Sequence, residues 1–189
     1  IALKAFPSCA ATHTAVEAAL IVRQQLSDRL GDISSVRVGV SELALEPLIY
    51  VKPATPLEGK FSMHYCVAAA LVHGALDLNS FSDEGIHHPA IDALIPRISM
   101  EVDDRVRDDR EFASVVTVET EKGERIEHMV RVALGKPARW LGARQLKQKF
   151  SDCCRYSGCA IDASEAFAAL QSMDGASSLD GILRLLQAR

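Results

Sequence analysis

The sequence predicts an α+β fold: a small, mostly antiparallel sheet of about four strands, packed with helices and followed by a helical C-terminal tail. Three observations lead to this class. Apolar and polar residues alternate in four short segments, two of which are joined by a tight turn. Two long segments have the apolar pattern of helices. After residue 135 the strand pattern stops and only helical segments follow.

The first helix is expected to begin after Thr12, a residue type that caps helix N-termini, and to end at Gly31. Its apolar positions form one broad face: Val16, Leu20, Ile21, Val22, Leu26 and Leu30. Residues 33–40 then alternate between apolar and polar side chains. This alternation indicates a strand with one face toward solvent.

The middle of the chain is predicted to be helical and irregular. A short segment at residues 43–50 leads into a connection that is interrupted by proline: Pro47, Pro53 and Pro56. Residues 61–76 are apolar almost all round, which predicts a buried helix. Residues 82–95 are expected to form short helices broken at Pro89 and Pro96.

Three further strands are expected at residues 98–102, 113–119 and 125–132. The last two are connected by Glu121-Lys-Gly-Glu124. Gly123 supplies the positive φ that a tight hairpin turn needs. These strands and the one at 33–40 make up the predicted sheet.

The change in pattern near residue 135 divides the chain into two predicted domains, residues 1–135 and residues 136–189. Helices in the second domain are expected at residues 143–150, 163–173 and 179–187. The apolar faces of these helices are narrow, so the helices would bury little apolar surface against one another. We therefore expect this tail to pack on a domain that the chain lacks.

Composition and charge exclude several classes of function. A net charge of −4 without a long basic run argues against a nucleic-acid partner. The chain has no apolar run close to the 18 or so residues of a membrane-spanning helix, so no membrane partner is expected. It opens on Ile1 without a lead-in segment, and we therefore expect a fragment whose other half lies upstream.

The five cysteines fit no disulfide framework and favour a reducing cytoplasm. Cys153, Cys154 and Cys159 form a group near the end of the chain. This group lacks the usual zinc-ligand spacing and has no histidine nearby. We therefore expect no metal site.

The strongest candidate for a functional site is the segment Lys4-Ala-Phe-Pro-Ser-Cys-Ala-Ala-Thr-His13. It brings a lysine, a cysteine and a histidine close together just ahead of a helix N-terminus. The free N–H groups and positive dipole end of a helix favour anions. The segment is therefore expected to suit an anionic ligand.

Four motifs, in the correct order, resemble the C-terminal part of the MmgE/PrpD family. They are Lys4-Ala-Phe-Pro-Ser-Cys-x3-His13, Glu58-Gly-Lys-Phe-Ser62, Phe81-Ser-Asp-Glu84 ahead of a His-Pro pair, and Glu119-Thr-Glu-Lys-Gly123. That family includes 2-methylcitrate dehydratases, cis-aconitate decarboxylases and iminodisuccinate epimerases. The resemblance covers nearly the whole chain. It implies that residues 1–135 are an α+β lid and that a large N-terminal helical domain is missing.

The resemblance further implies a cytoplasmic, homodimeric lyase or isomerase that needs no cofactor and acts on a small di- or tricarboxylate. Its reaction would be a dehydration, a decarboxylation or an epimerisation. All three handle a proton on a carbon beside a carboxylate, which requires a positioned acid or base and cations or donors on the carboxylates. Because further catalytic residues would lie in the missing domain, this chain alone is expected to be inactive.

The resemblance also assigns roles to individual residues. Lys4 would bind a substrate carboxylate, and Tyr50 would orient the substrate or donate a proton. Some family members carry a histidine at the position of Cys9. The Cys9 thiol is either an acid or a small packed side chain. His13 and Lys60 are candidates for substrate binding, with a structural role for His13 and a solvated Lys60 as the alternatives.

A second hypothesis is a non-enzymatic module that binds an anion or mediates assembly, with the tail as a docking helix. The tail separates the two hypotheses. An exposed apolar face on residues 140–189 would indicate a missing partner domain. A tail folded back on the sheet would indicate a self-contained module.

Overall fold

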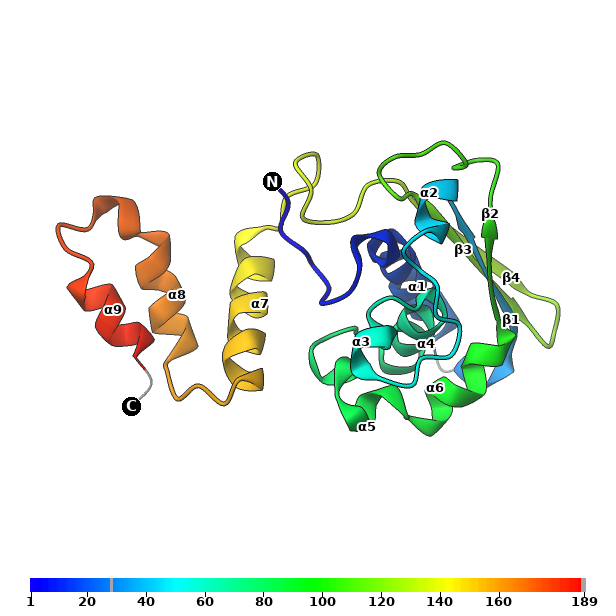
Figure 1. Cartoon of the computed structure of the whole chain (residues 1–189), viewed down its shortest axis with the longest axis horizontal. Helices are drawn as coiled ribbons and strands as arrows, with labels where there is room; N and C mark the ends of the chain where they lie inside the picture. The colour runs from blue at the N-terminus through cyan, green and yellow to red at the C-terminus, as the bar shows by residue number, and fades with distance from the viewer. Residues whose placement is uncertain (28, 188–189) are drawn as a thin grey trace. The chain divides into compact units, whose positions relative to one another are not determined.

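A four-stranded sheet organises the first part of the chain, in the strand order β2-β1-β3-β4. The computed structural model describes residues 1–27 and 29–187. The strands are β1 (Ile33–Val40), β2 (Ile98–Val102), β3 (Ser114–Thr120) and β4 (Arg125–Val130). The chain divides into two compact units, Ile1–Trp140 (unit 1) and Leu141–Arg189 (unit 2), and the sheet belongs to unit 1 (Figure 1).

The sheet is mixed, and the predicted α+β class is confirmed. β3 pairs antiparallel with both β1 and β4. β1 and β2 are parallel, with Val36 opposite Ile98 and Val40 opposite Val102. Parallel neighbours need a long crossover connection. Here the crossover runs through residues 41–97 and contains the helices of the middle of the chain.

The predicted hairpin between β3 and β4 is confirmed. Gly123 has φ +80°, and its N–H donates to the Thr120 carbonyl at 2.8 Å. The Thr120 N–H donates across the turn to the Glu124 carbonyl at 2.9 Å. The turn therefore sets the register of the pair, in which Glu119 lies opposite Arg125.

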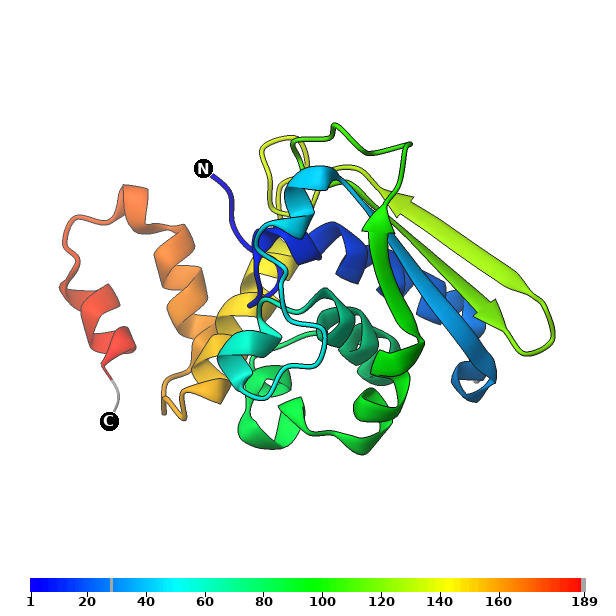
Figure 2. The same cartoon turned by 45° about the vertical axis from the view of Figure 1, so that its right-hand side comes forward.

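Two long helices cover one face of the sheet: α1 (His13–Leu26) and α4 (Met63–His73). α1 packs on β3, β4 and α4, and α4 also packs on β2; Figure 2 shows both helices behind the same side of the strands. The inward valines of β1 are fully or almost fully buried: Val36, Val38 and Val40. The small side chains of Ala68, Ala69 and Ala70 are also fully buried, which allows α4 to approach its neighbours closely.

The opposite face of the sheet carries a network of ion pairs. Arg105 lies 2.7 Å from both Asp103 and Glu127, and Arg37 lies 3.3 Å from Asp103. Hydrogen bonds from Arg105 and then from the Thr117 hydroxyl lower the pKa of Glu127 to about 2. Arg105 likewise holds the pKa of Asp103 well below its usual range. These charges are paired with each other across the sheet, so the network stabilises the strands.

Short helices fill the crossover and the connections around it. The α-helices are α2 (Glu42–Leu45), α3 (Pro56–Gly59), α5 (Asp83–Ile86) and α6 (Pro89–Leu94). The 3₁₀ turns are η1 (Ala10–Thr12), η2 (Arg29–Asp32), η3 (Asn79–Phe81) and η4 (Ile95–Arg97). Pro89 begins α6 because the first helical position needs no N–H donor. The prediction that Pro96 ends a helix is wrong in part, since the chain passes through it as η4.

The first helix begins after Thr12 as predicted, but the expected cap by the Thr12 side chain and the expected end at Gly31 are wrong. Thr12 has helical dihedrals and no capping hydrogen bond, because η1 leads directly into α1. Its hydroxyl donates instead to the Cys9 carbonyl at 2.8 Å. At the other end the helix stops at Leu26 with Ser27 at φ +53°. Gly31 lies beyond it in η2 and does not end the helix.

Unit 2 contains α7 (Ala143–Tyr156), α8 (Ala163–Gln171), η5 (Met173–Gly175) and α9 (Asp180–Leu186). α7 continues well beyond the predicted end at residue 150. The rings of Phe150 and Phe167 join α7 to α8, with centroids 5.8 Å apart. Several large apolar side chains of this unit are exposed: Tyr156, Met173, Leu179 and Leu183. None of the helices in the described residues combines the length and apolarity that crossing a membrane requires.

Candidate functional site

Two segments of unit 1, residues 4–13 and residues 50–62, make up the candidate site. The backbone N–H of Cys9 donates to the Lys60 carbonyl at 2.9 Å, which joins the two segments. Within the second segment, the Ser62 hydroxyl donates to the Val51 carbonyl at 3.4 Å. The structure thus brings together the stretches of chain that carry the residues predicted from sequence.

Lys4 lies over the turn that leads into η1. Its Nζ donates to the Ser8 carbonyl at 3.0 Å, while the side chain remains exposed. Below it, the hydroxyls of Ser8 and Thr12 are hydrogen-bonded to each other at 2.7 Å and are buried. An ammonium has three donors, so Lys4 keeps two for an anion. The Ser8–Thr12 pair was not predicted from the sequence, although the spacing of four residues across a turn is a signal that indicates it.

Cys9 is half-buried and packs against the hydrophobic core. Its neighbour Cys66, on α4, is fully buried, and its thiol donates to the Gly59 carbonyl at 3.4 Å. Burial raises the pKa of Cys66 to about 12, although the hydroxyls of Thr12 and Ser8 act in the opposite direction. Cys66 is therefore a neutral thiol that packs under the site, and Cys9 is the cysteine that reaches its surface.

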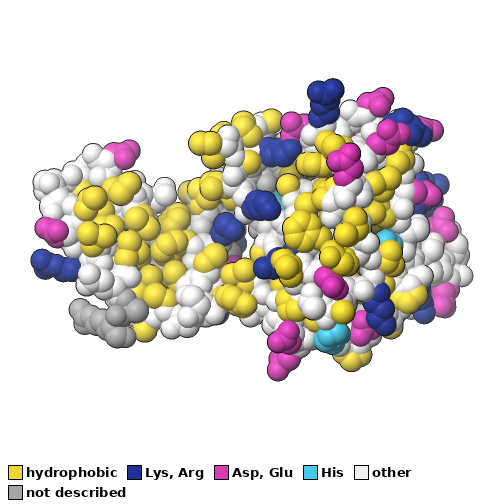
Figure 3. All heavy atoms as spheres, in the orientation of Figure 1, with side chains coloured by type: hydrophobic (Ala, Val, Ile, Leu, Met, Phe, Trp, Pro, Cys, Tyr) yellow, Lys and Arg dark blue, Asp and Glu magenta, His cyan; other side chains and the backbone are white. Residues whose placement is uncertain are grey.

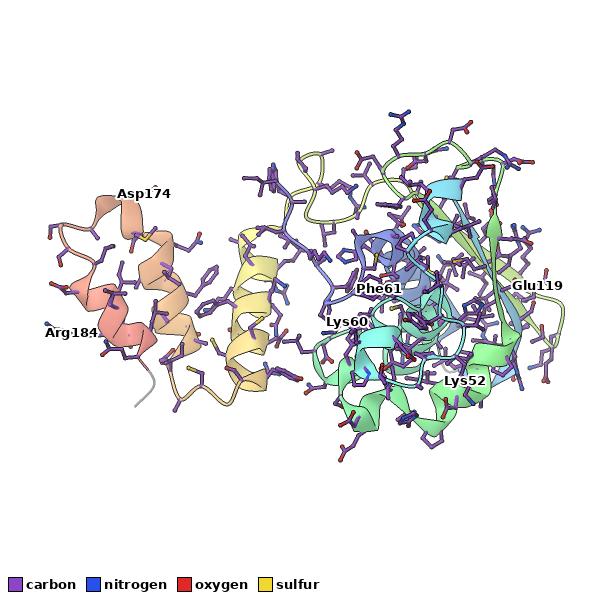
Figure 4. The ribbon with its side chains drawn as sticks, viewed as in Figure 1. Lys52, Lys60, Phe61, Glu119, Asp174 and Arg184 are labelled. Atoms are coloured by element: carbon purple, nitrogen blue, oxygen red, sulfur yellow. The ribbon has the colours of Figure 1, made fainter. Side chains whose placement is uncertain are left out.

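Lys60 follows the short helix α3, which begins at Pro56 with Thr55 as its N-cap. The Thr55 hydroxyl accepts a hydrogen bond from the Glu58 N–H at 3.3 Å, as an N-cap does. Lys60 is half-buried, and its Nζ lies 5.8 Å from the centre of the Phe81 ring, where a cation–π interaction holds it. Figure 4 shows Lys60 and Phe61 together at the end of α3, with Lys52 apart from them.

Tyr50 lies in the extended connection between α2 and α3 and is half-buried. Its two neighbours in sequence, Ile49 and Val51, are mostly exposed. The Ser62–Val51 hydrogen bond attaches this connection to the start of α4. This hydrogen bond therefore holds the main chain next to Tyr50 close to Ser62, two residues after Lys60.

His13 is buried as the first residue of α1, and its ring contacts Phe6 edge to face with centroids 5.4 Å apart. A buried ring at a helix start, packed on an aromatic side chain, helps to fix the turn between residues 6 and 13. This environment favours the structural role for His13 over direct contact with a ligand.

An apolar surface surrounds the candidate site. Large apolar side chains along residues 43–61 are exposed: Leu43, Leu45, Ile49, Val51, Leu57 and Phe61. Figure 3 shows hydrophobic side chains gathered on the part of unit 1 where Figure 1 draws α2, α3 and the segment between them. We call these six residues the apolar face. A cluster of this kind marks an interaction surface or a binding groove.

Other clusters in the described residues offer less chemistry. No three His, Cys, Asp or Glu side chains within residues 1–27 and 29–187 are arranged to hold a metal ion. The rings of His73 and His88 lie edge to face, with centroids 4.7 Å apart. Burial and then the neighbouring His88 lower the pKa of His73. These two histidines are not part of the candidate site.

The comparison with protein families identifies the chain. A family model, the MmgE/PrpD C-terminal domain, matches residues 6–172. The chain belongs to the MmgE/PrpD family. The match includes the candidate site from Phe6 onward, but not Lys4, and it continues through α7 and α8. A comparison with curated proteins gave no match.

The MmgE/PrpD family is generally one of enzymes of the dehydratase type. The family match also agrees with the C-terminal position that the four sequence motifs implied. The candidate site of this MmgE/PrpD domain contains cations, a phenol and a thiol on two joined segments. Such a set can bind an anion and can supply a proton.

Proposed function

We propose that this MmgE/PrpD domain is the substrate-capping part of a cofactor-independent lyase or isomerase that acts on a small di- or tricarboxylate. Residues 1–135 would form the lid and residues 136–189 the helices that return to the other domain. The reaction would be a dehydration, a decarboxylation or an epimerisation through proton transfer beside a carboxylate. The observation that carries the proposal is the Cys9–Lys60 hydrogen bond, which joins the segments of two lysines, Lys4 and Lys60.

The chemistry of such a substrate explains why lysines are needed. Loss or gain of a proton beside a carboxylate passes through a species whose negative charge spreads onto the carboxylate oxygens. Fixed cations that face those oxygens stabilise the charge as it develops. Lysine is a compact charge with three donors, and Lys4 uses one of them on the Ser8 carbonyl. Lys4 would therefore bind one carboxylate and Lys60 a second.

The remaining residues of the site would have smaller roles. Tyr50 would orient the substrate or donate a proton, and Cys9 would line the site. His13 would hold the turn that carries Lys4, with Phe6 as its partner. A base stronger than these groups would come from outside this chain, so the chain by itself would be inactive.

The domain that supplies the base would cover the apolar face. The matched family model describes a C-terminal domain, so related proteins contain a region that precedes it. The apolar face flanks Tyr50 and Lys60, the side on which an incoming substrate would be enclosed. Apolar side chains are also exposed on α9 and in the turns beside it, and a partner domain would cover them as well. We propose an N-terminal helical domain as that partner, and a homodimer of the complete enzyme in the cytoplasm.

The test uses the complete protein in D₂O with 2-methylcitrate, cis-aconitate and iminodisuccinate in turn. Proton NMR follows the signal of the hydrogen beside each carboxylate together with any product. We expect exchange or turnover with one of the three compounds and none with this chain alone. Absence of exchange and turnover with all three, together with binding of a simple anion such as phosphate, would favour a non-enzymatic anion-binding module.

A further inference from the structure

The C-terminal end of α7 in unit 2 has a specific turn that brings two cysteines together. The N–H of Cys159 donates to the Cys154 carbonyl at 3.1 Å, and the N–H of Gly158 donates to the Arg155 carbonyl at 3.2 Å. Gly158 has φ +67°, in the left-handed region. These two hydrogen bonds and this dihedral define a Schellman motif.

A Schellman motif places two side chains in contact. The residue after the left-handed glycine commonly packs on the residue that accepts its hydrogen bond. In α7 these two residues are Cys159 and Cys154. The chain reversal at Gly158 therefore places one thiol beside the other, where other helices have an apolar pair.

The surroundings of the thiols agree with this contact. Cys154 and Cys159 are both half-buried, whereas Cys153 is exposed. Burial raises the pKa of Cys154, and the adjacent Cys159 and Cys153 thiols raise it further. Successive residues of an α-helix point about 100° apart, so Cys153 faces a different side of α7 from Cys154. Cys159 is thus the cysteine that the turn places beside Cys154.

We propose that Cys154 and Cys159 form a reversible disulfide by thiol–disulfide exchange with a low-molecular-weight disulfide of the glutathione class. One thiolate attacks the small disulfide, whose S–S bond breaks and releases one thiol. The second cysteine then attacks the mixed disulfide and releases the second thiol. Two protein thiols are oxidised, one small disulfide is reduced to two thiols, and both protons pass to the released thiols.

The disulfide would change the end of α7 without moving it far. Disulfides need Cα atoms about 4.4–6.8 Å apart, a range that is reached where a chain turns back on itself. The bond would close a short loop around Gly158 and hold the end of α7 to the connection that leads into α8. The proposal concerns unit 2 alone and does not depend on the proposed function of unit 1.

The test is a peptide map of the chain after treatment with oxidised glutathione. The reaction is quenched with an alkylating agent and the protein is digested with trypsin, which cleaves after Arg155 and so separates the two cysteines. We expect peptides 150–155 and 156–184 to be linked, with a mass about 2 Da below the sum of the two reduced peptides plus the one alkyl group that the unlinked Cys153 carries. Dithiothreitol should separate them again.

Three single variants assign the bond. Cys153→Ser should form the linked pair to the same extent as the parent chain. Cys154→Ser and Cys159→Ser should lose the link and carry a glutathione adduct on the cysteine that remains. Glutathione adducts without a link in the parent chain would overturn the proposal, as would a link that Cys153 forms equally well in Cys154→Ser.

Discussion

The backbone N–H of Cys9 and the carbonyl of Lys60 are joined by a hydrogen bond of 2.9 Å. Because the contact is between main-chain atoms, it does not depend on the side chain at position 9. The segment of Lys4 can therefore keep its place beside Lys60 whether that position carries a thiol or, as the family resemblance implies for some members, an imidazole. Main-chain atoms therefore set the position of this segment, and the side chain at position 9 affects only the chemistry of the site.

Replacement of Lys4 by Ala in the complete protein should lower kcat/KM on the order of 10²-fold, because a charge partner of the reacting species is lost. Lys52→Ala is the matched control, since Lys52 is an exposed lysine of the loop between α2 and α3 and lies apart from Lys60 (Figure 4). Steady-state kinetics on the substrate found by NMR measures both variants. A Lys4→Ala enzyme with near-normal kcat/KM would exclude the proposed role.

Replacement of Cys9 by Ala should change kcat/KM by no more than about threefold, because the thiol is proposed to line the site and the backbone bond to Lys60 is kept. The same kinetic assay provides the measurement, with circular dichroism to confirm that the variant is folded. A decrease of more than about tenfold, accompanied by a changed pH profile, would instead assign proton transfer to the thiol.

Leu57→Lys should affect stability little in this chain and strongly in the complete protein. In this chain Leu57 is 67% exposed, so the change should alter the free energy of unfolding by less than about 0.5 kcal/mol. In the complete protein, where we propose that a helical domain covers the apolar face, the buried charge should cost about 2 kcal/mol or more. Urea titration of both proteins measures the difference. Equal effects would show that nothing covers Leu57.

Gly85→Ala should destabilise the chain by about 1–3 kcal/mol through overpacking. A Cβ at residue 85 would lie 2.5 Å from the Asn79 carbonyl oxygen and 2.8 Å from that of Ser80. The Ser80 oxygen cannot move freely because it accepts a hydrogen bond from the buried Tyr65 hydroxyl.

Gly31→Ala is the control for this change, since a Cβ there meets no atom within 4 Å. Its effect should stay within about 0.5 kcal/mol. Thermal and urea unfolding compare the two variants. The packing account of Gly85 would be wrong if both substitutions proved equally mild.

The ion-pair network on the open face of the sheet should make stability dependent on pH. The pKa of Glu127 is about 2 in the folded chain against an ordinary value of 4.5, so the charged carboxylate favours folding. This contribution is complete above about pH 4.5 and is lost as pH falls toward 2. Because the ion pairs are partly exposed to solvent, we expect it to be on the order of 1 kcal/mol.

Glu127→Gln should therefore lower stability at pH 7 and flatten its decline between pH 4.5 and 2. Urea midpoints measured across that range test the prediction. Glu121→Gln is the control, because Glu121 is an exposed residue of the β3–β4 turn. An unchanged slope in Glu127→Gln would show that the acid sensitivity arises elsewhere.

Several features that depend on neighbouring residues were predicted correctly from the sequence. The strand at 33–40, the hairpin at Gly123 and the buried alanine-rich helix each follow from a pattern within one short stretch. The side chains that lie on one face of a strand or helix are set by its period, so burial could be predicted with it. The four motifs that indicated the MmgE/PrpD family are likewise local, and the family model confirms the family that they indicated.

Features that join distant residues were decided only by the tertiary structure. The parallel pairing of Val36 with Ile98 depends on how the whole crossover folds over the sheet. The wrong cap at Thr12 has a local cause instead, because η1 precedes α1 directly and the Thr12 hydroxyl is hydrogen-bonded to Ser8 and Cys9. No residue pattern within either segment predicts the contact between Cys9 and Lys60. Local propensity acts over a few residues, whereas the site is assembled by packing between segments that lie far apart along the chain.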